Sequence, residues 1–89
     1  MQLRRLLVDV LIPHEPDIFV FAEGLCKLDK VDGVTIHVAE VDDKTKTVEI
    51  TIEGEDLSFD AISQTIEDIG GSIHSIDEVA VGSRIILRK

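Results

Sequence analysis

The sequence is poor in the residues that most often carry redox, metal and stacking chemistry. Its 89 residues include one cysteine, Cys26, so the chain forms no internal disulfide and no cysteine cluster for zinc or an iron–sulfur centre. Tryptophan and tyrosine are missing and phenylalanine occurs three times, which removes most of the aromatic platforms on which nucleic-acid bases stack. Cys26 lies in an apolar stretch with helical spacing, and we expect it to pack in the core.

Basic side chains are also scarce. Nine lysines and arginines stand against 18 aspartates and glutamates, which gives a net charge of −9 at pH 7. A field of this sign repels phosphate backbones and argues against nucleic acid as a partner. The apolar run near the N-terminus is interrupted by Asp9 and ended by Pro13, so it is too short and too polar for a signal peptide or a membrane span. We therefore expect a cytoplasmic protein without a membrane partner.

Motifs for covalent catalysis and phosphate binding are missing as well. None of the serines lies in a G-x-S-x-G context. Gly70 and Gly71 are not followed by G-x-G-x-x-G or by a Lys-Ser pair, so they indicate a helix stop and not a phosphate cradle. An enzyme with a nucleophilic side chain therefore has little support.

What the sequence does contain is alternation of apolar and polar residues, the pattern of half-buried strands. Residues 3–11 place Leu6, Val8 and Val10 on one face and Asp9 on the other. The same pattern runs through residues 34–41 and 47–53, which a polar hairpin turn joins, and through residues 72–81. In the last segment Ile73 and Ile76 are three positions apart, which breaks the alternation and predicts a β-bulge.

Two other segments have apolar residues at helical spacing. We expect Pro16 in the first turn of the first helix, and KVDG at residues 30–33 to end it. In the second helix Ser58 is a suitable N-cap and Gly70 a suitable stop. The expected buried positions are Ile18, Phe21, Ala22, Leu25 and Leu28 in the first helix and Phe59, Ile62, Ile66 and Ile69 in the second.

The order of elements is therefore β-α-β-β-α-β. Right-handed crossovers turn this order into a split βαβ sandwich. The sequence predicts an α+β, ferredoxin-like βαββαβ sandwich over residues 1–89 as one domain, with an antiparallel sheet in the order 4-1-3-2 and both helices on one face.

Four stretches resemble a small archaeal family, domain-of-unknown-function family 211. They are LLVDVLIPHEP, GVTIHVAEVD, VEITIEGEDLSFDAI and IEDIGGSIHSIDEVAVG, and together they span most of the chain. The resemblance implies a ferredoxin-like domain that assembles into rings of identical subunits and binds divalent cations. It implies no particular activity.

The expected strand order brings metal-ligating side chains to one end of the sheet. Asp9, Glu49 and His74 should meet there, with His37 one strand further out. Two imidazoles and two carboxylates on the open face suit a divalent ion such as zinc or manganese. The alternative is a solvated face on which Arg5 pairs with a carboxylate.

A second acidic group precedes the second helix. Glu53, Glu55 and Asp56 supply oxygens of the kind that calcium or magnesium requires. Carboxylates at this position also stabilise a helix through its dipole, so a purely structural role is the alternative.

The leading functional hypothesis is a self-assembling binding module, a homo-oligomer larger than a dimer with a regulatory or storage role. Apolar residues outside the expected core support it: Leu7, Leu11, Phe19, Val20 and the tail RIILRK. Ligand or metal would then bind between subunits. The alternatives are a small-molecule sensor like the amino-acid-binding regulatory domains of this architecture, and a small enzyme using His37 and His74 as an acid–base pair.

Overall fold

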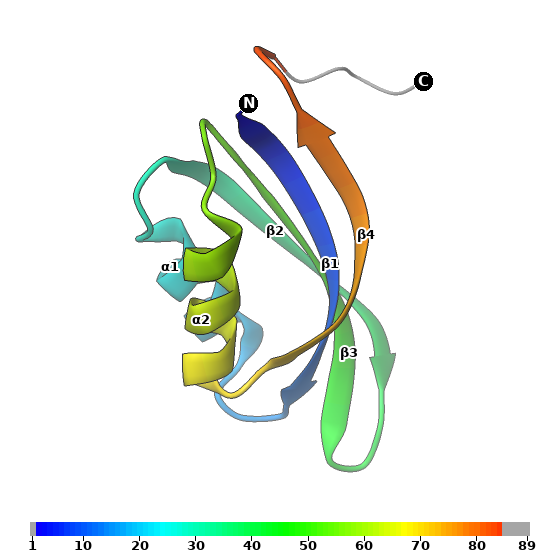
Figure 1. Cartoon of the computed structure of the whole chain (residues 1–89). Coiled ribbons are helices and arrows are strands. Elements are labelled where there is room, and N and C mark those ends of the chain that lie inside the picture. Colours follow the sequence, from blue (N-terminus) through cyan, green and yellow to red (C-terminus); the bar gives the residue numbers. More distant parts are fainter. Residues whose placement is uncertain (1, 85–89) are drawn as a thin grey trace.

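The computed structural model describes residues 2–84 and shows a four-stranded sheet with both helices on one side (Figure 1). The elements are β1 (Leu3–Pro13), α1 (Ile18–Cys26), β2 (Val31–Val41), β3 (Thr45–Gly54), α2 (Phe59–Ile69) and β4 (Ser72–Val81). The strands lie in the order β2-β3-β1-β4 and every neighbouring pair is antiparallel. The predicted ferredoxin-like fold is confirmed. The tail RIILRK, which the sequence suggested as contact surface, spans residues 84–89, and all of it after Arg84 lies outside the described residues.

The core lies between the helices and the two central strands. Alternate residues of β1 and β3 face the helices because side chains of a strand point to opposite faces in turn. The buried apolar residues are Leu6, Val8, Val10 and Ile12 of β1, Val48, Ile50 and Ile52 of β3, Phe21 and Leu25 of α1, Leu57, and Ile62 and Ile66 of α2. We call this side of the sheet the covered face and the other side the open face.

Polar side chains and a glycine mark the helix ends. Asp17 caps α1 by accepting a hydrogen bond from the backbone N–H of Phe19, and Ser58 caps α2 by accepting one from Ala61. Gly70 ends α2 with φ of 115°, a conformation that side chains with a Cβ disfavour. The predicted caps of α2, Ser58 and Gly70, are therefore confirmed, whereas Pro16 lies before the Asp17 cap of α1 and not in the first turn.

The prediction for the end of α1 was wrong. The helix ends at Cys26, and β2 already begins at Val31. The cause is the tight turn between them, in which Lys30 has φ of 70° and its carbonyl accepts a hydrogen bond from Glu55 N–H. Cys26 was expected in the core and is exposed, because it lies one residue, or about 100° of helix rotation, beyond the buried Leu25.

Strand β4 contains the predicted irregularity and a second one. Ser75 pairs with Asp9 and Ile73 with Val10, which leaves His74 without a partner on β1. A further register shift between Ile76 and Glu78 leaves Asp77 unpaired in the same ladder. These two bulges keep both isoleucines on the covered face, because their partners Val10 and Val8 are buried there.

Candidate functional site

A row of polar side chains crosses the open face. Asp9 pairs with Glu49, Glu49 pairs with His37, and Ser75 pairs with Asp9 on the other side. The row therefore runs Ser75–Asp9–Glu49–His37 across all four strands. Directly opposite residues have Cβ atoms about 4.5–5.5 Å apart, so each side chain can reach the next.

His74 lies beside this row and not in it. The bulge places His74 with Asp9, Leu11 and Thr47 around a hollow of about 230 Å³ on the open face. One imidazole and one carboxylate therefore share a small depression. Among residues 2–84, however, no three His, Cys, Asp or Glu side chains lie close enough together to hold a metal ion. Among the described residues, the hollow thus brings together two side chains of metal-ligating type, Asp9 and His74.

The electrostatics of the row are unfavourable as they stand. Asp9 and Glu49 are directly opposite, and like charges in that position destabilise a sheet. Neither carboxylate takes part in an ion pair with another of the described residues. A bound cation would relieve this repulsion.

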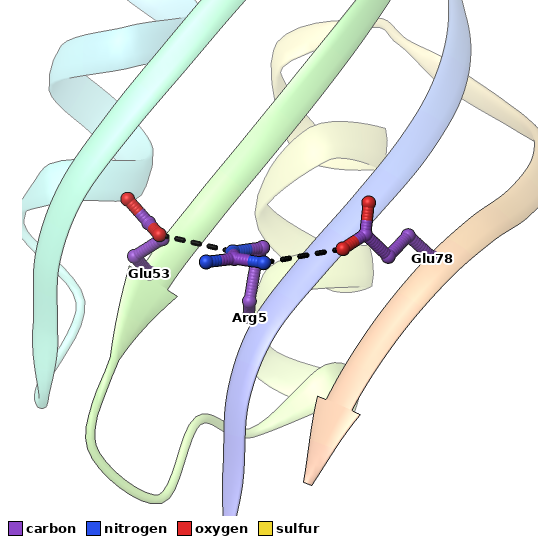
Figure 2. Close-up of polar contacts among 3 residues, drawn as sticks. All are labelled: Arg5, Glu53 and Glu78. Carbon is purple, nitrogen blue, oxygen red and sulfur yellow. Dashed lines mark hydrogen bonds and ion pairs between the residues drawn. The ribbon is translucent and has the colours of Figure 1, made fainter. Parts of the chain in front are cut away.

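At the other end of the open face, the carboxylates have a basic partner within the chain (Figure 2). Arg5 Nε donates to Glu53 Oε2 at 3.0 Å, and Arg5 Nη1 donates to Glu78 Oε2 at 3.2 Å. The Arg5 side chain is 14% exposed and bridges β3 and β4 across β1. The hydrogen bond to Glu53, helped by the one to Glu78, raises the pKa of Arg5 above its ordinary value although desolvation opposes it. The expected pairing of Arg5 with a carboxylate is thus present.

The carboxylates of the second acidic group, Glu53, Glu55 and Asp56, do not lie around one common site. Glu53 is turned to Arg5 on the open face, whereas Asp56 lies 3.5 Å from Lys30 Nζ. Glu55 and Asp56 line a different hollow, of about 210 Å³, together with Lys30. Two of the three carboxylates therefore already have a basic partner.

The contacts of the serines and histidines show no catalytic pair among the described residues. Ser75 Oγ donates to Asp77 Oδ1 at 2.7 Å. His14 Nε2 donates to the carbonyl oxygen of Asp42 at 2.7 Å, which ties the turn after β1 to the β2–β3 turn. No hydrogen bond within residues 2–84 joins a serine hydroxyl to an imidazole.

Two features were missed by sequence reasoning. The covered-face residues Ile76, Val79 and Val81 are exposed although they are apolar and lie on the same side of the sheet as the core. Lys30 and Asp56 both have positive φ and form an ion pair between two loops. A period-2 pattern reports which face a side chain lies on but not whether a helix covers it.

None of the helices within residues 2–84 is long and apolar enough to cross a membrane.

Comparison with known proteins agrees with the resemblance seen in the sequence. The model of domain-of-unknown-function family 211, described as "Uncharacterized ArCR", matches residues 4–89. A relative from Methanocaldococcus jannaschii, "Uncharacterized protein MJ0319", is 51% identical over 84 residues, which cover 94% of this chain and 87% of the relative. These descriptions state no substrate and no activity. On both matches, the chain belongs to domain-of-unknown-function family 211.

Proposed function

We propose that the protein is a self-assembling binding module, a homo-oligomer larger than a dimer, that takes up a divalent cation and serves a regulatory or storage role. The observation that carries self-assembly is the number and spread of exposed apolar side chains. They include Leu11, Phe19, Val20, Ile76, Val79 and Val81. Apolar surface in several separate regions of so small a chain is typical of subunit contacts.

The proposed cation site is the Asp9–Glu49 pair with His37 and His74. Imidazole nitrogens and carboxylate oxygens suit zinc or manganese, and a purely oxygen-bound ion such as calcium or magnesium would favour the carboxylates. The net charge of −9 raises the local concentration of any cation. Since one copy brings fewer than three ligands together among its described residues, a second copy would complete the coordination.

Sedimentation equilibrium tests the assembly. At micromolar concentration the mass should exceed that of two chains of 9.8 kDa each. Interfaces of standard size hold together at such concentrations. A mass of one or two chains would contradict the proposal.

Equilibrium dialysis against zinc, manganese, calcium and magnesium tests cation uptake. The wild type should retain at least one of these ions, and a chelator should remove it. Because the Glu53, Glu55 and Asp56 group is an alternative oxygen site, Asp56→Asn serves as the comparison for Asp9→Asn. Loss of uptake in Asp56→Asn with full uptake in Asp9→Asn would move the site to the loop before α2.

A further inference from the structure

The outer edge of β4 is unusually open for an edge strand. Ile76, Val79 and Val81 are 52%, 57% and 47% exposed. Figure 1 shows that α2 lies beside the start of β4, while the strand bends away from the helix toward its C-terminal end. Edge strands are ordinarily protected by proline, lysine or bulges. β4 contains no proline or lysine, and its own extra residues lie before Glu78, since the register shift between Leu3 and Arg5 places the extra residue on β1.

The backbone hydrogen-bonding groups that face outward along this edge belong to the same apolar residues. In an antiparallel strand, successive residues point their N–H and C=O to opposite sides. Gly82 N–H donates to the carbonyl of Gln2 on the β1 side. Ala80 therefore also faces β1, and the backbone groups of Val79 and Val81 face outward.

At the opposite edge of the sheet, the outward-facing backbone groups of β2 also belong to apolar residues. Glu55 N–H donates to Lys30 C=O, so every second residue back along β3, including Thr51, faces β2. Thr35, the partner of Thr51, then faces β3. It follows that Ile36 and the residues two positions before and after it point their backbone groups outward.

The two edges match in one register on the covered face. If β4 and β2 run antiparallel with Val81 opposite Val34, then Val79 falls opposite Ile36. The bulge at Asp77 absorbs one residue, which brings Ile76 opposite Val38. The three β2 residues in this set, Val34, Ile36 and Val38, are partly buried apolar side chains that pack against the core. Each apolar residue exposed on β4 thus meets an apolar residue of β2, and each such pair can exchange backbone hydrogen bonds.

The same register suits the open face. It places Ala80 opposite Thr35 and Glu78 opposite His37. A carboxylate then lies beside an imidazole, where a shift of two residues would set Glu78 beside Thr35 or Ala39 and leave one apolar pair unmatched. Glu78 also keeps its contact with Arg5, which lies on the other side of β4.

We propose that copies of this chain join head to tail, with β4 of one copy pairing with β2 of the next in the register that sets Val79 opposite Ile36. The direction of the strands permits this. Because four strands alternate in direction, β4 and β2 at the two edges run opposite ways, so identically oriented copies form one continuous antiparallel sheet. Such a contact uses different surfaces of each copy and closes into a ring or extends beyond two copies. This inference rests on the proposed self-assembly and names its surfaces.

Cross-linking tests the register. In the Cys26→Ser background, Thr35→Cys and Ala80→Cys together place thiols at a non-hydrogen-bonded pair, where Cα atoms are about 4.5 Å apart and a disulfide can form. Oxidation should give a ladder of covalent multimers longer than two chains that a reductant collapses. Neither single variant should cross-link. Dimers from Ala80→Cys alone would show that β4 pairs with β4 about a two-fold axis and would overturn the proposal.

A matched pair of valine variants tests the surface itself. Val79→Lys introduces a charge into the proposed contact, and Val41→Lys introduces the same charge at a 60% exposed β2 position outside the register. Both side chains are exposed, so both variants should fold. We expect Val79→Lys to sediment as a single chain of 9.8 kDa and Val41→Lys to keep the wild-type mass.

The outcomes separate this inference from the proposed function. If the wild type assembles but Val79→Lys keeps its mass and the cysteine pair does not cross-link, self-assembly stands and the edge pairing is wrong. If the wild type is itself a monomer, both are wrong.

Discussion

The covered and open faces of the sheet differ in how fully their side chains find suitable neighbours within one chain. On the covered face, every inward residue from Leu6 to Ile12 of β1 is buried against the helices. On the open face, Arg5 forms ion pairs with two carboxylates at one end, while Asp9 and Glu49 oppose each other without a basic partner among the described residues. Core packing therefore explains the arrangement of the covered face. It does not explain why Asp9 and Glu49 lie opposite each other on the open face.

The largest expected effect lies on the covered face. Ile62 is 1% exposed, so Ile62→Ala leaves a cavity between α2 and the sheet. We expect a loss of about 2–4 kcal/mol in the free energy of unfolding. Val8→Ala should cost less because fewer methyl groups are removed. Urea unfolding measures both, and a wild-type midpoint for Ile62→Ala would show that α2 does not pack as described.

A smaller loss is expected at the Arg5 end of the open face. Arg5→Met keeps an apolar stem but leaves Glu53 and Glu78 without their shared cation, so the urea midpoint should fall. Arg5→Lys keeps the charge, but it has no planar guanidinium with which to reach both carboxylates. Its urea midpoint should therefore lie between those of the wild type and Arg5→Met. A double-mutant cycle with Glu53→Gln isolates the pair, and a coupling of zero would mean that the contact in Figure 2 contributes nothing.

At the Asp9–Glu49 pair we expect a substitution to stabilise the protein instead of destabilising it. Asp9→Asn removes one of two opposed like charges while preserving shape and hydrogen-bonding capacity. In the presence of a chelator we expect a gain of about 0.2–1 kcal/mol in the free energy of unfolding. Asp42→Asn, in the exposed turn after β2, is the control for a general reduction in negative charge. An equal gain in both variants would show that the local opposition has no special effect.

The sequence predicts which residues lie on each face of the sheet better than it predicts the local register of a strand. Alternation in β1 and β3 identified the covered face, and topology brought Asp9, Glu49 and His37 into neighbouring strands. The phase of β4 was harder, because a spacing of three between Ile73 and Ile76 signals a bulge without showing where Asp77 leaves the ladder.

Exposure was the least predictable property. Cys26 and Val79 have the side chains of core residues, and both are exposed. For Cys26 the reason is its position in α1, one residue or about 100° of helix rotation beyond the buried Leu25. For Val79 the reason is that β4 bends away from α2 (Figure 1). The bend of β4 is a long-range arrangement and leaves no local signal in the sequence.

The smallest change in stability, and the sharpest test of the open face, is expected for His74. This exposed side chain lies at a bulge, so without metal His74→Ala should alter the free energy of unfolding by less than about 0.5 kcal/mol. If zinc or manganese binds His74 with Asp9, either ion should raise the thermal midpoint of the wild type, since a ligand that binds the folded state stabilises it.

His74→Ala should then lose most of that rise, and a chelator should abolish the remainder. His14→Ala is the matched control, because that imidazole is engaged with the Asp42 carbonyl away from the row. If calcium raises the midpoint equally in the wild type and in His74→Ala, the ion is held by oxygens alone. If no ion raises the thermal midpoint, Asp9 and Glu49 repel each other without a bound cation. The packing of the covered face would then offset the free energy that this repulsion costs.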